Sequence, residues 1–224
     1  MEFACIFDWD GVIIDSSEHH IEGWKRFAKE ENFVFPEQHF KQSFGMKNEQ
    51  IIPQLWKWTD DPDEIRRIDL RKEALYRDIM KENGLVALPG VAELLALLKK
   101  NKVPCAIGSS APLANVTTGL EILDYGHFFQ AIVSGEDVKL GKPDPQIFLT
   151  AAFRLAVPPR RCIVFEDAKV GVAAAKAGGM KVCAVTNTYP AEELSNADLI
   201  VSSLEEVTIG TLLELHGGSS ENLD

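Results

Sequence analysis

The stretch Ala4-Cys5-Ile6-Phe7-Asp8-Trp9-Asp10-Gly11-Val12 decides the fold, because an apolar run near the start of the chain ends in two carboxylates one residue apart. The apolar run predicts a buried β-strand of the kind found in a parallel sheet, which is covered on both faces. Burying an unpaired carboxylate costs several kcal/mol. We therefore expect the strand to lead into a site that neutralises Asp8 and Asp10, and a divalent cation is the simplest neutralising group.

Similar apolar runs recur along the chain and alternate with helical patterns. Strands are expected over residues 3–7, 103–108, 131–134, 161–165, 181–185 and 199–201, with helical patterns that include 91–100, 145–155 and 170–177. Alternating strands and helices predict a parallel sheet with helices on both faces. The expected fold class is therefore α/β, with a doubly wound parallel sheet.

Residues 16–84 interrupt this alternation. They contain no convincing strand, and helical patterns rich in charge cover 18–30, 48–57 and 63–82, with Trp56 and Trp58 expected in a helical core. The segment is too long for a single crossover helix, and the turn at Leu88-Pro89-Gly90 marks the return to the sheet. We expect an α/β core domain formed by 1–15 and 85–216, a helical domain at 16–84, and a flexible tail at 217–224.

The charge balance of the chain restricts its partners. The 224 residues include 23 Lys and Arg against 34 Asp and Glu, which gives a net charge of −11. Nucleic acids and anionic membranes require clustered positive charge, so we expect neither as a partner. A small phosphorylated ligand remains compatible, because a few local cations are enough to hold it.

The cysteines and the start of the chain indicate the compartment. The four cysteines lie in apolar, strand-like runs without zinc-site spacing, which is typical of buried thiols in a reducing compartment: Cys5, Cys105, Cys162 and Cys183. No signal peptide is recognisable, and no apolar run approaches the roughly 20 residues that span a bilayer. The expected state is a cytoplasmic monomer or weak dimer.

Chemically active side chains follow four of the expected strands. Asp8 and Asp10 come after the first strand, and Ser109 and Ser110 follow the second. Later strands are followed by a loop that carries Lys142 and by the pair Glu166-Asp167. Sites in open α/β sheets form at the carboxyl ends of strands, so we expect these side chains to lie together. Carboxylates so close must share protons or a cation, and hard oxygen ligands select Mg²⁺.

Some of these residues also fit helix starts. Ser110 is expected near a helix N-cap with Pro112 in the first turn, where free N–H groups attract anions. Asp144 and Pro145 look like the N-cap and first residue of the next helix, and Asp167 is placed to cap the helix that follows it. Lys142 offers a compact charge for a phosphate oxygen.

Taken together, these residues resemble the haloacid dehalogenase superfamily of aspartate-nucleophile phosphotransferases. Asp8-Trp9-Asp10-Gly11-Val12 matches its first motif, Ser109 its second, Lys142 its third and Glu166-Asp167 its fourth. The resemblance covers the chain to about residue 215, and 16–84 looks like the C1-type helical cap of the β-phosphoglucomutase and phosphoglycolate phosphatase subfamily. It implies a Rossmann-like core and a cap that closes over the site.

The resemblance also implies roles for the site residues. Asp8 attacks phosphorus and forms an aspartyl phosphate, while Asp10 acts as general acid and then as general base. Mg²⁺ is bound by the Asp8 side chain, the Asp10 backbone carbonyl and Asp167, with Glu166 as a direct or indirect ligand. The phosphoryl oxygens are held by a set of residues around the first two motifs and the lysine: Trp9, Gly11, Ser109, Ser110 and Lys142.

The sequence favours a phosphatase of a small phosphorylated metabolite, with a hexose-phosphate mutase as the alternative. A mutase must hold a second phosphate, and the mutases of the family use a cap arginine after a Gly-hydrophobic pair. Here that stretch reads Gly45-Met46-Lys47-Asn48-Glu49, without an arginine. Substrate specificity is expected in the cap, at His20, Trp24 and the stretch from Met46 to Glu49, with Lys47 and Asn48 as its polar contacts.

Two other classes fit less well. Dehalogenases of the superfamily lack the second aspartate, so Asp10 argues against that reaction. Receiver-type signalling modules also phosphorylate an aspartate without being enzymes, but they are shorter and have no helical insert.

Overall fold

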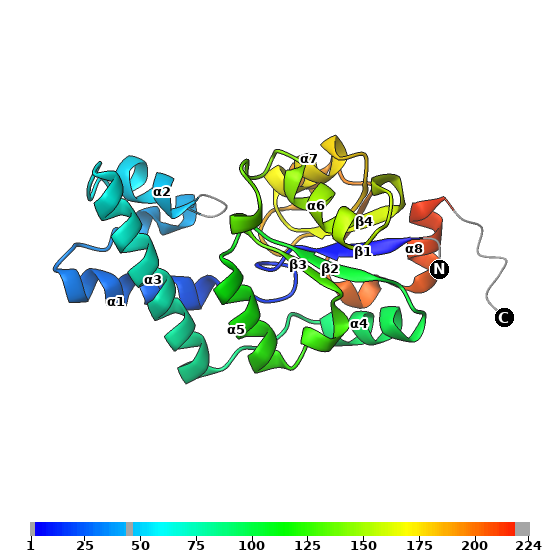
Figure 1. The fold of residues 1–224 in the computed structure, drawn as a ribbon, viewed down its shortest axis with the longest axis horizontal. Helices are drawn as coiled ribbons and strands as arrows, with labels where there is room; N and C mark the ends of the chain where they lie inside the picture. Colours follow the sequence, from blue (N-terminus) through cyan, green and yellow to red (C-terminus); the bar gives the residue numbers. More distant parts are fainter. Residues whose placement is uncertain (1–2, 44–46, 218–224) are drawn as a thin grey trace. The chain divides into compact units, whose positions relative to one another are not determined.

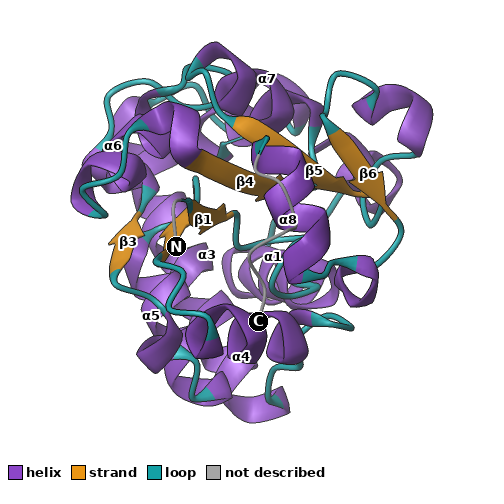
Figure 2. Cartoon of the chain, turned by 90° about the vertical axis from the view of Figure 1, so that its right-hand side faces the viewer, coloured by secondary structure: helices purple, strands orange, loops and turns teal. Residues whose placement is uncertain are grey.

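The computed structural model describes residues 3–43 and 47–217 and contains a six-stranded parallel sheet in the order β3-β2-β1-β4-β5-β6 (Figures 1 and 2). The strands are β1 (Ala4–Phe7), β2 (Cys105–Gly108), β3 (Ala131–Val133), β4 (Cys162–Glu166), β5 (Lys181–Val185) and β6 (Leu199–Val201). The predicted α/β class with a doubly wound parallel sheet is confirmed. The expected tail lies outside the described residues from 218 onward.

The strand order determines where a site can form. β1 is central and pairs with β2 on one side and β4 on the other, with Phe7 in register with both Ile107 and Phe165. The direction of winding reverses at this point, so the loops that leave β1 and β4 diverge and open a crevice. The carboxyl end of β1, where Asp8 follows, is therefore the predicted position for a ligand.

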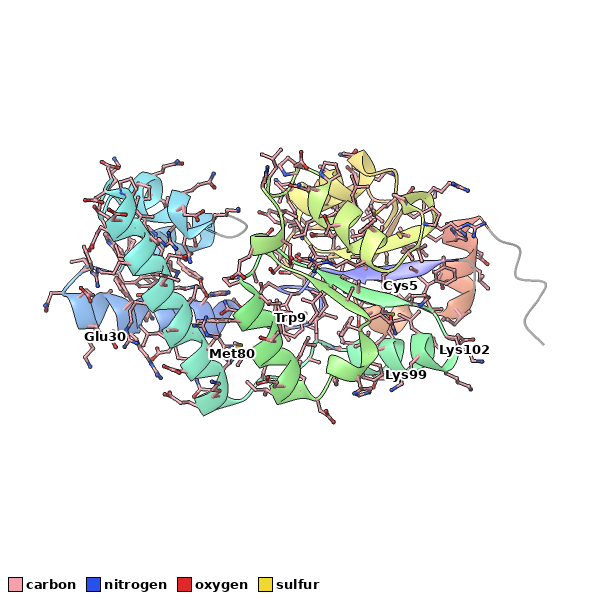
Figure 3. All side chains as sticks on the ribbon, viewed as in Figure 1. Cys5, Trp9, Glu30, Met80, Lys99 and Lys102 are labelled. Atoms are coloured by element: carbon pink, nitrogen blue, oxygen red, sulfur yellow. The ribbon has the colours of Figure 1, made fainter. Side chains whose placement is uncertain are left out.

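Helices cover both faces of the sheet. α6 (Gln146–Arg154) and α7 (Lys169–Ala177) lie on one face, and α4 (Val91–Lys100) and α5 (Leu113–Leu123) lie on the other (Figures 1 and 2). Phe148 of α6 packs in the core with strand residues such as Ile6 and Val164. The four cysteines are buried in this sheet as free thiols, as the sequence predicts, and Cys5 is labelled on β1 in Figure 3.

The chain divides into two compact units, one formed by Met1–Asp15 and Val86–Asp224 and the other by Ser16–Leu85. The second unit is helical and contains α1 (Ser17–Glu31), η1 (Glu37–Ser43), α2 (Asn48–Gln50), η2 (Ile51–Leu55) and α3 (Pro62–Asn83). It has its own core, in which Trp24, Phe27 and Trp56 pack on Ile68. Trp56 is thus a core residue, as expected, and Trp58 packs against the same cluster.

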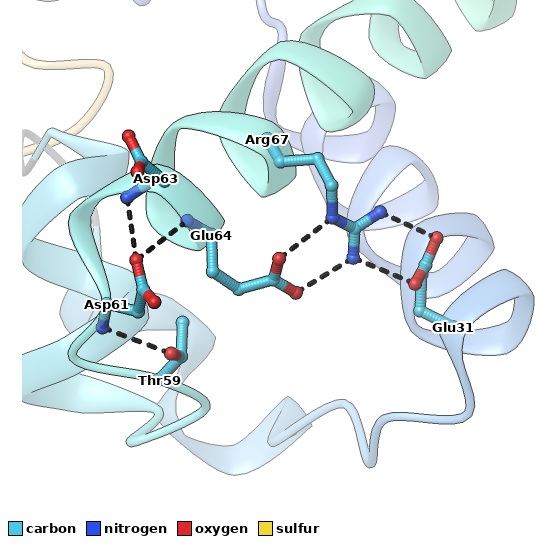
Figure 4. Close-up of polar contacts among 6 residues, drawn as sticks. All are labelled: Glu31, Thr59, Asp61, Asp63, Glu64 and Arg67. Carbon is cyan, nitrogen blue, oxygen red and sulfur yellow. Dashed lines mark hydrogen bonds and ion pairs between the residues drawn. The ribbon is translucent and has the colours of Figure 1, made fainter.

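Local contacts account for the start of α3. The Asp61 side chain accepts hydrogen bonds from the backbone N–H groups of Asp63 and Glu64 and so caps the helix (Figure 4). Arg67 on the first turns pairs with Glu64 and with Glu31 of α1. These ion pairs are exposed to solvent, so they contribute little to the stability of the fold.

The helical pattern expected over residues 48–57 forms two short helices of different winding, which end at Leu55. Three residues form α2, and the five that follow, Ile51–Leu55, form a π-helical turn closed by the Trp56 N–H and the Ile51 carbonyl at 2.9 Å. Pro53 lies inside this turn and has no N–H to continue an α-helical ladder, which explains the change of winding.

Two of the helices that follow site residues begin later than expected. α5 begins at Leu113 with Pro112 as its N-cap, not near Ser110, and α6 begins at Gln146 with Pro145 as its N-cap. The Asp144 side chain still accepts a hydrogen bond from the Gln146 N–H at 2.9 Å. In each case proline, with its φ fixed and no N–H to satisfy, occupies the position just before the first helical residue.

Asp167 does not cap the following helix. α7 begins at Lys169 with Ala168 as its N-cap and has no side-chain cap. The Glu166 Oε2 atom accepts hydrogen bonds from the N–H groups of Asp167 and Ala168, each at 2.9 Å. The Asp167 carboxylate is therefore not used in capping.

The last helix, α8 (Ile209–His216), had no counterpart among the sequence expectations. Thr208 and Thr211 form a reciprocal capping box, and Gly217 ends the helix in the left-handed conformation. Leu212 on this helix is fully buried, whereas the neighbouring Leu213 is half-buried. The capping pattern Thr-x-x-Thr and the final glycine were the available signals.

We predict that Leu212→Ala lowers the free energy of unfolding by about 2–5 kcal/mol, because it leaves a cavity beneath α8. Leu213→Ala is the matched control and should cost less than half as much. Urea denaturation monitored by circular dichroism measures both values. Equal losses in the two variants would mean that α8 does not pack through Leu212.

Candidate active site

The site lies at the carboxyl ends of three adjacent strands. Asp8 follows β1, Ser109 follows β2, and Glu166 and Asp167 end and follow β4. All four residues are buried, and Glu166 has no exposed surface. The sheet therefore brings together residues that are more than 150 positions apart in the sequence.

Lys142 is the cation of this cluster. Its Nζ atom lies 3.1 Å from Asp8 Oδ1 and donates a hydrogen bond to Glu166 Oε1. The same ammonium lies 4.8 Å from the centroid of the Phe148 ring, a distance typical of a cation–π contact. The side chain is only 6% exposed, so this lysine is not a solvated loop residue.

The charges of the cluster do not balance. Burial would lower the pKa of Lys142, but the carboxylates of Asp8 and Glu166 outweigh it and raise this pKa, so the ammonium persists. Burial raises the pKa of Glu166 to about 7 against the opposing effect of Lys142. Burial, Glu166 and Asp8 together raise the pKa of Asp167. One ammonium thus faces three carboxylates, which leaves an excess of negative charge.

A cation fits this excess. Oxygen atoms of Asp8, Glu166 and Asp167 lie within 4.8 Å of one another, close enough to share one ion. Oxygen donors of this kind suit Mg²⁺. Both oxygens of Glu166 already have hydrogen-bond donors, which leaves Asp8 and Asp167 with more capacity for direct ligation. The Asp10 carboxylate is not part of this cluster in the described structure.

A tight turn carries the chain from Asp8 past Asp10. Gly11 has φ of +76°, and its N–H donates to the Ile14 carbonyl at 2.8 Å. A Cβ atom at Gly11 would lie 1.9 Å from Asp167 Oδ2, so only glycine permits this approach. The Trp9 side chain, labelled in Figure 3, is fully buried, and Asp10 is partly exposed.

The two serines differ. Ser109 is buried, and its Oγ atom accepts a hydrogen bond from the Ala111 N–H at 3.1 Å, which leaves the hydroxyl hydrogen free to donate. Ser110 is exposed. The sheet thus assembles Ser109 with the acidic cluster, whereas the Ser110 side chain does not belong to the buried part of the site.

Two polar residues after β5 were missed by the sequence analysis. Asn187 Nδ2 donates to the Gly11 carbonyl at 2.9 Å, and the Thr188 hydroxyl bonds to the Asp167 carboxylate. They follow residues 181–185, an expected strand, and the strand-end rule that singled out the other residues applies equally to them.

Three of the predicted specificity residues gather around one buried lysine in the helical unit. Lys72 Nζ lies 2.7 Å from His20 Nδ1 and 2.7 Å from Glu73 Oε1, and it lies over the Trp24 ring. Asn48 Nδ2 donates to the same Glu73 oxygen at 2.7 Å. No sequence pattern distinguished Lys72 from the charged surface of its helix.

The exposure of these residues differs. Trp24 is almost completely buried and packs edge-on against Trp56, with ring centroids 4.3 Å apart. His20 stacks on Tyr76 with ring centroids 4.1 Å apart. Lys47 is exposed. Gly45 and Met46, which carry the comparison with the mutases, lie outside the described residues.

Within the described part of the chain, no helix combines the length and the apolar character needed to cross a membrane.

Comparison with known proteins gives concordant matches. Residues 5–185 match the family described as haloacid dehalogenase-like hydrolase. The chloroplastic 5-amino-6-(5-phospho-D-ribitylamino)uracil phosphatase of Arabidopsis thaliana is 37% identical over 215 residues, 95% of this chain but 57% of that protein. The phosphorylated carbohydrates phosphatase of Thermotoga maritima is 33% identical over 182 residues, which cover 80% of this chain and 82% of the relative.

A solved structure shares the fold of this chain over nearly its whole length. The β-phosphoglucomutase of Clostridium difficile superimposes with a TM-score of 0.83 at 27% identity and covers 97% of this chain and 98% of its own. The named relatives are thus phosphatases of phosphorylated metabolites and a sugar-phosphate mutase.

A substitution at Gly171 of α7 tests how rigidly the Glu166 side chain is held in place. Alanine normally stabilises a helix by about 1 kcal/mol relative to glycine, but a Cβ atom here would lie 1.7 Å from Glu166 Oε1. We predict that Gly171→Ala destabilises the protein by about 1–3 kcal/mol. Gly178→Ala, whose Cβ would meet its nearest atom at 3.4 Å, is the control. Urea unfolding measures both, and a stabilised G171A variant would contradict the prediction.

His20 makes stability depend on pH. Burial and the charge of Lys72 lower its pKa from 6.5 to about 3, so the folded protein holds it neutral. Unfolded chains bind a proton here below about pH 6.5, so the stabilisation from neutral His20 is lost as the pH falls from about 6.5 toward 3.

We predict that His20→Asn shows a smaller loss of thermal unfolding temperature between pH 7.5 and 5 than the wild type does. His19→Asn is the control and should retain the wild-type difference. An H20N variant with an unchanged pH dependence would show that His20 titrates normally in the folded state.

Proposed function

Because the chain belongs to the haloacid dehalogenase-like hydrolases, we propose that it is a Mg²⁺-dependent phosphatase that hydrolyses a small phosphorylated metabolite. The observation that carries the proposal is the buried arrangement of Asp8, Lys142, Glu166 and Asp167 at the carboxyl ends of adjacent strands. It combines a nucleophile, a fixed cation and a set of oxygen ligands in one place.

Asp8 attacks phosphorus. Its carboxylate displaces the leaving oxygen and forms an aspartyl phosphate, which water then hydrolyses. Lys142, 3.1 Å away, favours the ionised nucleophile and offsets the negative charge of the incoming phosphate. The buried position of both side chains strengthens this interaction.

Asp10 acts as the acid and base. It is separated from Asp8 by one residue and is partly exposed, so it can exchange protons with solvent between steps. It protonates the leaving oxygen in the first step and accepts a proton from the attacking water in the second.

The phosphoryl oxygens are held by Ser109, by Lys142 and by the turn after β1. The free hydroxyl hydrogen of Ser109 donates to one oxygen, and the backbone N–H groups of Trp9 and Ser110 are further donors. The Gly11 N–H is already bonded to the Ile14 carbonyl, so Gly11 contributes through the tight turn that it permits. Fixed donors of this kind stabilise the charge that spreads over the phosphoryl group in the transition state.

Asp8 and Asp167 would hold the metal, together with the Asp10 backbone carbonyl that the family resemblance implies. Glu166 orients Lys142 and the chain at Asp167. When bound, Mg²⁺ supplies Lewis-acid stabilisation of the phosphate charge and offsets the repulsion between the anionic nucleophile and substrate.

The helical unit, residues 16–84, acts as the cap and selects the substrate. His20, Trp24, Lys47 and Asn48 are the residues proposed for this role. Three of them gather around the buried ion pair of Lys72 and Glu73, which holds them in one place. The names of the relatives support a phosphorylated sugar or polyol as the substrate class.

A hexose-phosphate mutase is the alternative function, supported by the solved β-phosphoglucomutase that shares the fold over the whole chain. The location in the cytoplasm and the monomeric or weakly dimeric state stay predictions.

Phosphate release from p-nitrophenyl phosphate and from a panel of sugar phosphates tests the function. We expect Mg²⁺-dependent release that EDTA abolishes, with a loss of at least about 10³-fold in Asp8→Asn and a smaller loss in Asp10→Asn. Asp124→Asn is the control, because this exposed residue ends α5 in a left-handed conformation that asparagine tolerates.

Full activity in the D8N variant would overturn the mechanism. Interconversion of hexose phosphates in the presence of glucose 1,6-bisphosphate, faster than phosphate release, would establish the mutase instead.

A further inference from the structure

The loop that follows β5 reaches the acidic cluster at two points. Asn187 Nδ2 donates to the carbonyl of Gly11, and the Thr188 hydroxyl bonds to the carboxylate of Asp167. Gly11 and Asp167 lie on different loops, after β1 and after β4. Residues 187 and 188 therefore tie together two loops that no covalent link joins directly.

Gly11 and Thr188 both lie close to the Asp167 carboxylate. A Cβ atom built at Gly11 would lie 1.9 Å from Asp167 Oδ2 and 3.1 Å from Thr188 Oγ1. The Asp167 carboxylate is thus held between the backbone of Gly11 and the hydroxyl of Thr188, and it is only 4% exposed. A carboxylate confined in this way has few other rotamers available.

The loop itself is anchored at both ends. The Thr186 N–H donates to the Val201 carbonyl of β6 at 3.0 Å. The Tyr189 ring lies beneath the ammonium of Lys169, 4.9 Å from its centroid, and Lys169 also pairs with Glu193. Thr188 is consequently presented to Asp167 by a fixed segment of chain, although its own surface is exposed.

We propose that Thr188 is a positioning residue that holds the Asp167 carboxylate in the orientation required to bind the metal ion. The inference rests on the proposed function, since Asp167 is there a ligand of Mg²⁺. A hydroxyl that donates to one carboxylate oxygen leaves the other free for the ion and prevents rotation. Groups that orient metal ligands in this way contribute about 10–100-fold to metal affinity. On the other side of the Asp167 carboxylate, Asn187 fixes the turn after β1 through its hydrogen bond to the Gly11 carbonyl.

The test measures Mg²⁺ binding to the substrate-free full chain by isothermal titration calorimetry. Thr188→Val removes the hydroxyl while keeping the branched shape, and it should weaken Mg²⁺ binding by about 10-fold. Thr188→Ser keeps the hydroxyl and should bind Mg²⁺ within about twofold of the wild type. Thr186→Val makes the same chemical change two residues earlier in the loop and should leave the affinity unchanged.

Kinetics give an independent readout. If Thr188 acts through the metal, the phosphatase activity of T188V should recover toward the wild-type kcat when Mg²⁺ is raised, with the KM for substrate little changed. Thermal unfolding of the metal-free variants checks that the fold is retained.

The outcomes separate the inference from the proposed function. Wild-type affinity for Mg²⁺ in T188V overturns the inference alone, and so does an equal loss in T188S or T186V. A wild-type chain that binds no Mg²⁺ overturns the inference together with the metal-dependent function.

Discussion

The ammonium of Lys142 lies between the carboxylates of Asp8 and Glu166, in a place almost closed to solvent, and much of the site depends on this contact. Without it, three buried carboxylates would face one another with no fixed positive charge, and the pKa values of Glu166 and Asp167, already raised by burial, would rise further. Glu166 connects this contact to the fold, because its second oxygen binds the N–H groups that precede α7. The Glu166 side chain thus contributes both to the charge balance of the site and to the position of the chain before α7.

Most of the architecture could be predicted from the sequence, because the physical signals were local. Apolar runs at β1, β5 and β6 correspond to strands within a residue or two of the expected limits, and α4 has the expected limits. The gathering of Asp8, Ser109, Lys142 and Glu166 followed from one rule, that loops at the carboxyl ends of parallel strands converge.

The remaining features depend on tertiary contacts that a local pattern does not carry. Lys72 looks like any charged residue of α3, yet it is buried against His20 and Glu73. Asp167 had the right residue type and position for a helix cap, but α7 has no side-chain cap, and Glu166 accepts hydrogen bonds from the two N–H groups that precede the helix. The roles of Asn187 and Thr188 depend on the side-by-side placement of β1, β4 and β5, which the order of strands along the chain does not reveal.

The two compact units have separate hydrophobic cores, one around the sheet and one around Trp24 and Phe27. Substitutions that lie far apart and share no packing partners have nearly additive effects on stability. The helical unit can therefore accumulate changes over evolutionary time without disturbing the packing that fixes Asp8 and Lys142. One reaction centre can thus be retained while changes in the helical unit alter which substrates are accepted.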